Sequence, residues 1–162
     1  MNQDLTADEL IALLDLQPLA GEGGYFRQTY HQPDESGFGS LTTAILFLIT
    51  PDAYSGLHRL THDELFHFYL GDACEMVTFR TGEDFGITTL GADLRRGMKI
   101  QHLVEAEYWQ GTRLRTGGRF ALLGTTMTPG FDPAGFHLAS EATLFGLREG
   151  DRTFARSYLP VD

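Results

Sequence analysis

The sequence has little of what marks secreted, membrane-spanning or nucleic-acid-binding proteins. A single cysteine, Cys74, excludes a disulfide within the chain, which favours a reducing cytoplasmic location. Lysine and arginine total 12 against 22 aspartates and glutamates, and phosphate binding needs clustered cations, so we expect no nucleic-acid partner. The longest apolar run, residues 44–49, is far too short to span a bilayer, and residues 1–6 lack the basic and apolar segments of a signal peptide. We therefore expect a soluble cytoplasmic protein without a membrane partner.

The composition favours one domain built mainly from β-strands. The 162 residues are 42% hydrophobic and 12% aromatic, which suffices for the core of a single domain over residues 1–162. The 19 glycines indicate many tight turns, and short apolar runs recur between those turns. No helical pattern separates most of the predicted strands, which favours an all-β sandwich or barrel over an α/β fold.

A short helix is predicted near the N-terminus. Thr6 and Glu9 have the spacing of a capping box, and leucines follow at helical intervals until Pro18 ends the helix. We expect this segment, residues 1–20, to pack on the main body and to have no catalytic role.

Residues 41–50 form the most apolar of the predicted strands. One of its faces carries Ile45 and Phe47, and the other carries Leu46 and Leu48. A strand that is apolar on both faces predicts either a covered sheet or a subunit interface. We favour the interface, and therefore a homodimer.

The densest group of chemically active side chains lies in residues 55–71. This stretch holds three of the six histidines, His58, His62 and His67, together with Glu64. Strand alternation predicts that His58 and Glu64 form a pocket pair; the alternative is a buried ion pair or a satisfied core group. A regular strand would turn His67 to the opposite face, whereas a bulge would turn it into the pocket. His62 is expected to be a solvated corner residue.

Several segments resemble the cupin superfamily. His58, Glu64 and Gly71 have the spacing of the first cupin motif, and residues 97–110 resemble the second. Five segments in the same order are similar to the fifth cupin family: Glu22–Arg27, His58–Arg59, Asp63–Tyr69, Trp109–Gln110 and Pro129–Phe131. The resemblance implies a single antiparallel cupin-type β-barrel, or jelly roll, that holds a small organic ligand.

The set of cupin metal ligands is incomplete in this chain. Leu60 occupies the position of the second motif-one histidine, and Gln110 that of the motif-two histidine. Transition-metal sites need three or four imidazole, carboxylate or thiolate ligands. We therefore expect no cofactor and no tightly bound metal. A divalent ion would bind only weakly, through His58, Glu64 and Gln110.

The resemblance also implies candidate functions. Related sugar-nucleotide epimerases of the superfamily move a proton beside a carbonyl without a metal. This implies an isomerase or epimerase that acts on a sugar-like or nucleotide-linked substrate. The alternatives are a non-catalytic small-molecule binding or sensing module and a metal-dependent cupin enzyme, and the residues leave open whether the protein is an enzyme.

The candidate site residues fall into two groups. The predicted catalytic residues are His58, Glu64 and His67, with a histidine as base, Glu64 orienting an imidazole, and Tyr69 or Tyr108 as acid. The side chains predicted to bind the ligand supply guanidinium, aromatic and amide groups, and they are Arg27, Arg59, Tyr69, Tyr108 and Gln110.

Overall fold

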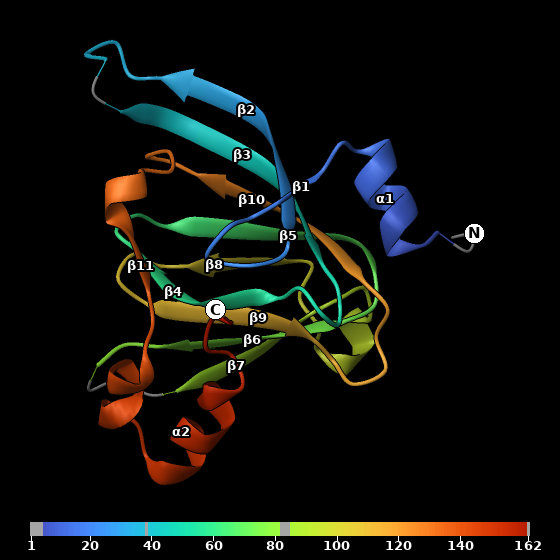
Figure 1. The fold of residues 1–162 in the computed structure, drawn as a ribbon, viewed down its shortest axis with the longest axis vertical. Coiled ribbons are helices and arrows are strands. Elements are labelled where there is room, and N and C mark those ends of the chain that lie inside the picture. The colour runs from blue at the N-terminus through green and yellow to red at the C-terminus, as the bar shows by residue number, and fades with distance from the viewer. Residues whose placement is uncertain (1–4, 38, 82–84, 162) are drawn as a thin grey trace.

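The structure is a computed structural model that describes residues 5–37, 39–81 and 85–161. In these residues the strands form two antiparallel sheets that face one another as a jelly roll, with helices α1 (Ala7–Leu13) and α2 (Glu149–Arg156) outside them (Figure 1). The connections include the short 3-10 helices η1 (Leu94–Arg96), η2 (Pro133–Gly135) and η3 (Glu141–Gly146).

The chain crosses repeatedly between the two sheets. The first sheet has the spatial order β1 (Gln17–Pro18), β2 (Tyr25–Pro33), β3 (Ser40–Ile49), β10 (Ala121–Met127), β5 (Glu64–Gly71) and β8 (Gln101–Val104). The second has the order β11 (Phe136–Leu138), β4 (Ser55–Leu60), β9 (Trp109–Leu114), β6 (Cys74–Phe79) and β7 (Gly86–Leu90). The predicted all-β jelly roll with an N-terminal helix is confirmed. Over the described residues, however, the sheets do not close into one continuous barrel.

The main core lies between the two sheets. Phe47, Phe66 and Leu123 point inward from the first sheet, and Cys74 and Met76 point inward from the second. Every second residue of a strand faces the same side, so each strand contributes alternate side chains to this layer. Burial raises the pKa of the Cys74 thiol to about 12, which keeps this thiol neutral and unreactive at physiological pH.

Helix α1 begins with the predicted capping box. The Thr6 hydroxyl accepts from the Glu9 amide at 3.2 Å, and the Glu9 carboxylate accepts from the Thr6 amide at 2.8 Å. The helix then packs Leu10 on the outer face of the first sheet, against Leu48 of β3 and Leu122 of β10. The second apolar face of residues 41–50 is therefore covered within the chain and does not require a second subunit. The homodimer stays a prediction.

The C-terminal segment covers the outer face of the second sheet. In Figure 1, α2 lies beside this sheet. Leu144 of η3 and Ala155 of α2 pack against Leu57 of β4 and Val77 of β6. The sequence did not predict α2, because its residues are largely polar and it has no side-chain cap at its start. No described helix is both long and apolar enough to cross a membrane.

Strands β2 and β3 extend beyond the other strands as a hairpin, at the upper left of Figure 1. The outer part of β2 is exposed from Arg27 to Pro33. The base of this hairpin forms one wall of the interior space described next.

Candidate functional site

A cavity of about 190 Å³ opens between the two sheets. Its walls are mainly apolar and strongly aromatic, and they include Phe26, Phe47, Phe66, Met127, Phe131 and Phe136. A smaller set of polar side chains faces the same space, namely Glu22, Gln28, Thr43, His58, Glu64 and Thr125. Mainly apolar walls with few polar groups are typical of sites for small organic ligands.

His58 is held in one orientation by its own strand. The residue is 2% exposed, and its Nδ1 lies 2.7 Å from the carbonyl oxygen of Gly56. A carbonyl oxygen only accepts, so Nδ1 must carry the hydrogen. In the neutral ring this leaves Nε2 as an acceptor and a base, and His58 has no other hydrogen bond to the described residues. The ring of Phe136, 5.2 Å away between centroids, packs against the imidazole.

Glu22 reaches His58 from a glycine-rich turn. Its Oε1 lies 3.9 Å from His58 Nδ1 and accepts a 2.7 Å hydrogen bond from the Ser55 hydroxyl. Gly56 donates its amide to the Glu22 carbonyl oxygen, and a Cβ on Gly56 would lie 2.8 Å from that oxygen. Gly23 has φ +103°, a left-handed conformation that favours glycine. These glycines allow the turn to approach β4 closely enough to place Glu22 in the cavity.

Glu64 lies at the start of β5 with its carboxyl group buried. Burial raises its pKa above the ordinary value, and the nearby Glu22 carboxylate raises it further. His58 opposes this effect, as do hydrogen bonds from Thr125 and Gln110. The bond from Gln110 Nε2 to Glu64 Oε2 is 2.8 Å long. The site therefore places an imidazole of fixed orientation near a buried carboxyl group whose pKa is raised.

The residues present do not fit the metal that the fold family implies. His58 and Gln110 are cross-strand neighbours on β4 and β9, and Glu64 contacts Gln110, so the cupin ligand positions do come together. Gln110, however, turns its NH₂ group toward Glu64, and its Oε1 is buried without a partner. Leu60 adds an apolar side chain to the cavity wall. Within the described residues, no group of three histidine, cysteine, aspartate or glutamate side chains is placed to hold a metal ion.

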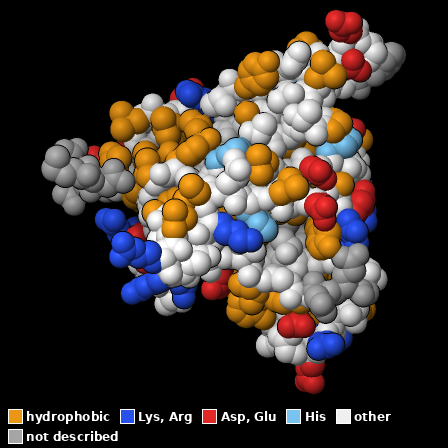
Figure 2. Space-filling view, turned by 180° about the vertical axis from the view of Figure 1, so that it is seen from behind, with side chains coloured by type: hydrophobic (Ala, Val, Ile, Leu, Met, Phe, Trp, Pro, Cys, Tyr) orange, Lys and Arg blue, Asp and Glu red, His pale blue; other side chains and the backbone are white. Residues whose placement is uncertain are grey.

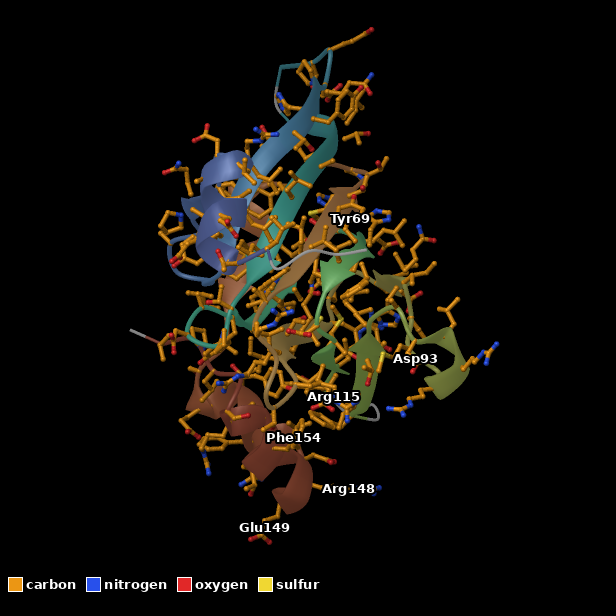
Figure 3. All side chains as sticks on the ribbon, turned by 90° about the vertical axis from the view of Figure 1, so that its right-hand side faces the viewer. Tyr69, Asp93, Arg115, Arg148, Glu149 and Phe154 are labelled. Atoms are coloured by element: carbon orange, nitrogen blue, oxygen red, sulfur yellow. The ribbon has the colours of Figure 1, made fainter. Side chains whose placement is uncertain are left out.

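His67 and Tyr69 lie outside the cavity, on the outer face of β5. From Glu64 to His67 the pairing of β5 with β10 is regular, and the register shifts only beyond His67. Alternation therefore turns Glu64 and Phe66 inward and His67 outward. Tyr69 is 53% exposed and stacks on the His67 ring at 6.3 Å (Figure 3). The prediction of His67 as a cavity base required a bulge at the corner, and the strand has none there.

The predicted arginine and tyrosine ligands also lie elsewhere. Arg27 is exposed on β2, and Arg59 pairs with Glu107 at 3.3 Å while stacking on Trp109. Tyr108 packs beneath the Arg80 guanidinium, 4.3 Å from the ring centroid. Of the predicted ligand-binding residues, Gln110 contacts the polar part of the cavity, through its hydrogen bond to Glu64.

Several cavity residues were not predicted from the sequence. Glu22 was not among the predicted site residues, although the glycines after it indicate a close backbone approach. Thr125 faces inward because it pairs with Phe66 across β10 and β5, which becomes evident only once the strand register is known. Phe131 and Phe136 enter from the η2 region, where the sequence carries no clear periodic pattern.

A jelly roll that brings a histidine, a carboxyl group and an amide together from its two sheets, beside an interior cavity, defines a cupin-type protein. The sequence matches the family described as "Cupin superfamily (DUF985)" over residues 8–139. The match covers most of the chain, so the chain belongs to this family, the fifth cupin family.

Solved structures support the same fold. A protein of Shewanella oneidensis is 27% identical, with a TM-score of 0.88 over 98% of this chain and 99% of that chain. A hypothetical protein from Leishmania major is 25% identical, with a TM-score of 0.83 over 96% and 99% of the two chains. A cupin 2 domain-containing protein from Halorhodospira halophila shares the fold at 10% identity, with a TM-score of 0.59 over 89% and 88%. No curated protein sequence matches the chain significantly.

Proposed function

We propose that the protein binds a small organic molecule in the cavity and moves a proton on it, as a metal-independent isomerase or epimerase. The observation that carries the proposal is the 2.7 Å hydrogen bond between His58 Nδ1 and the Gly56 carbonyl oxygen. This bond fixes the tautomer of the ring, so that Nε2 of the neutral form is the nitrogen that can serve as a general base in a cavity of molecular size.

Glu64 is the proposed acid partner. Its raised pKa keeps a proton on the carboxyl group closer to neutral pH, as a general acid requires. Nε2 of His58 takes a proton from a carbon beside the substrate carbonyl, and Glu64 donates its proton to the carbonyl oxygen. From a 2-hydroxy carbonyl substrate this gives an enediol. Glu64 then takes the proton of the hydroxyl group on the carbon that lost its hydrogen, and His58 returns its proton to the former carbonyl carbon, so the carbonyl group moves by one position. Tyr69 and Tyr108 lie outside the cavity, so the acid role passes to Glu64.

Glu22 supports the charged intermediate of this sequence. Its carboxylate lies 3.9 Å from His58 Nδ1, and its side chain is 15% exposed. An opposite charge at this distance stabilises the imidazolium that forms when His58 accepts a proton.

The cavity favours a sugar-like or other small carbonyl compound over a nucleotide-linked one. None of the described side chains that line it is a lysine or arginine, and a diphosphate group is usually bound by such cations. A metal-dependent reaction is disfavoured by Leu60 and Gln110. A non-catalytic binding module is the second candidate, and the largely apolar walls favour it because they would hold a ligand without acting on it.

Solvent deuterium incorporation tests the proposal. Small aldoses, ketoses and 2-oxo compounds are incubated with the protein in D₂O, and exchange of the carbon-bound hydrogen is followed by proton NMR. We expect exchange with at least one compound, a loss of about 100-fold or more in His58→Ala, and full rates in the matched variant His67→Ala. Exchange that survives His58→Ala would contradict the assigned base. Binding without exchange for every compound would support the binding module instead.

A further inference from the structure

The described residues that line the cavity include acidic side chains but no lysine or arginine. The carboxylic side chains that line it are Glu22 and Glu64. On the molecular face in Figure 2, lysine and arginine side chains gather mainly along one edge. A ligand in the cavity therefore meets negative or neutral protein groups and no permanent positive charge.

The hydrogen-bonding groups of the cavity are mainly acceptors. His58 is only 2% exposed and lines the cavity. Its Nε2 has no hydrogen-bond partner among the described residues and can accept a hydrogen bond from a ligand. Glu22 accepts from Ser55, and Glu64 accepts from Gln110 and Thr125; a carboxyl group has more acceptor sites than these, so each keeps acceptor capacity for a ligand. Thr43 accepts from the Phe131 amide at 2.8 Å, and its hydroxyl hydrogen is one of the few donors. Such a site matches a ligand that is rich in donors.

The volume of the cavity and the chemistry of its walls further restrict the ligands that it can hold. An apolar cavity of about 150 Å³ holds benzene, so one of about 190 Å³ holds a single ring with a short substituent. Phenylalanines supply several of the walls, and aromatic faces attract cations as well as apolar groups.

We propose that the ligand carries an ammonium group on a compact aromatic or aliphatic body, with the ammonium directed to Glu22, Glu64 and Nε2 of His58. The inference rests on the proposed function, since it takes the same cavity as the ligand site and names the class of compound. A cation in the cavity favours the ionised form of Glu64 as well as that of Glu22, and it gains charge-assisted hydrogen bonds that a neutral or anionic head group cannot make.

Three compounds of nearly equal shape test the inference: benzylamine, benzyl alcohol and benzoate. Their affinities are measured by isothermal titration calorimetry near neutral pH. We expect benzylamine to bind about tenfold or more tightly than benzyl alcohol, since hydrogen bonds to charged groups are about twice as strong as neutral ones. Benzoate should bind weakest of the three. Equal or tighter binding of the alcohol or the carboxylate overturns the inference, as does the absence of saturable benzylamine binding at millimolar concentration.

Variants of Glu22 and Glu64 test whether their carboxyl groups cause the preference for the amine over the alcohol. Glu22→Gln and Glu64→Gln should each reduce the ratio of amine to alcohol affinity several-fold, and the double variant should abolish the preference. Glu35→Gln, an exposed change of the same chemical type outside the cavity, should leave the ratio unaltered. Circular dichroism confirms folding of each variant, and a preference that persists in the folded double variant overturns the inference.

Different results would contradict the proposed proton-transfer function and the proposed ammonium ligand. Deuterium exchange that depends on His58, found with neutral sugars while benzylamine does not bind, would remove the ammonium inference and leave the proton-transfer function. Selective binding of benzylamine without any exchange would leave the inference and remove the catalytic proposal.

Discussion

His58 lies on the inner face of the second sheet and His67 on the outer face of the first, and their ring nitrogens are used differently. His58 is 2% exposed, with Nδ1 bonded to the Gly56 carbonyl and Nε2 left for the cavity. On the outer face of β5, His67 uses both nitrogens: Nε2 lies 3.1 Å from the Thr126 hydroxyl and Nδ1 lies 3.3 Å from the Gln101 amide. One imidazole keeps a lone pair for chemistry, and the other is fully occupied in a surface network.

This difference shows that a cluster of histidines in sequence is not a cluster in space. Strand parity turns Glu64 and Phe66 into the cavity and leaves His67 with Tyr69 outside. The inner face is enclosed and aromatic, so its polar groups are few, and burial raises the pKa of the Glu64 carboxyl group. The outer face is open to solvent, which screens charges and tolerates substitution. The following predictions test this contrast between the faces.

The largest difference between the two faces is expected when a charge is introduced, because it should lower the unfolding free energy far more on the inner face than on the outer face. Phe47→Glu places a carboxylate in the core between the sheets, where Phe47 is 2% exposed, and should cost about 4 kcal/mol or more of unfolding free energy. Leu103→Glu, on the outer face where Leu103 is 48% exposed, should change stability by about 0.5 kcal/mol or less. Urea denaturation measures both variants. Similar losses in the two would contradict the assignment of faces.

Removing each histidine should affect ligand binding on one face only. His58→Ala removes the cavity acceptor and should weaken binding of any cavity ligand by about tenfold, because a buried hydrogen bond to the ligand is lost. His67→Ala should leave the affinity unchanged. The ligand-induced rise in melting temperature measures the effect in both variants. An equal loss in the two would place the site elsewhere.

Restoring cupin ligands should convert the inner face into a metal site. Leu60→His combined with Gln110→His adds two imidazoles beside His58 and Glu64 and should raise zinc affinity by at least about tenfold over the natural chain. After dialysis, we expect the natural chain to retain far less than one equivalent of transition metal by mass spectrometry. If the natural chain holds stoichiometric metal and His58→Ala loses it, the conclusion that the cavity residues fit a metal ion poorly is wrong.

Stability should depend on pH through Glu64. Its pKa in the folded state is raised above the ordinary 4.5, so its contribution to stability is complete below about pH 4.5 and is lost as pH rises through the folded-state pKa. Each unit of elevation corresponds to about 1.4 kcal/mol, or roughly 3–5 °C in a domain of this size. Glu64→Gln should therefore melt higher than the natural chain at neutral pH and similarly at pH 4. Glu35→Gln is the exposed control, and identical pH profiles for Glu64→Gln and the natural chain would contradict the raised pKa.

Loss of the predicted homodimer is expected to have the smallest effect on folding stability. Sizing by light scattering should give about twice the 18.0 kDa chain mass. If the outer face of the first sheet carries the contact, Leu103→Glu should produce monomer with a nearly unchanged fold. A natural chain that is monomeric at all accessible concentrations would remove the dimer prediction.

Short-range patterns in the sequence determined much of the architecture. The capping box at Thr6 and Glu9, the alternation along β5 and the motif spacing from His58 to Gly71 all depend on neighbouring residues. Hydrogen bonding within a helical turn and the two-residue repeat of a strand act over a few positions, so they can be recognised without knowledge of the fold. The meeting of His58, Glu64 and Gln110 followed from the cupin motifs.

The tertiary structure alone decided what surrounds these residues. Glu22 comes beside His58 because a glycine-rich turn docks on β4, and Thr125 faces the cavity because β10 pairs with β5 in a particular register. Helix α1 covers the second apolar face of β3, which the sequence pattern could not distinguish from a subunit interface. Each of these contacts joins segments far apart in the chain. Their geometry depends on the packing of the whole molecule, because side-chain periodicity states which face is apolar but not what covers it.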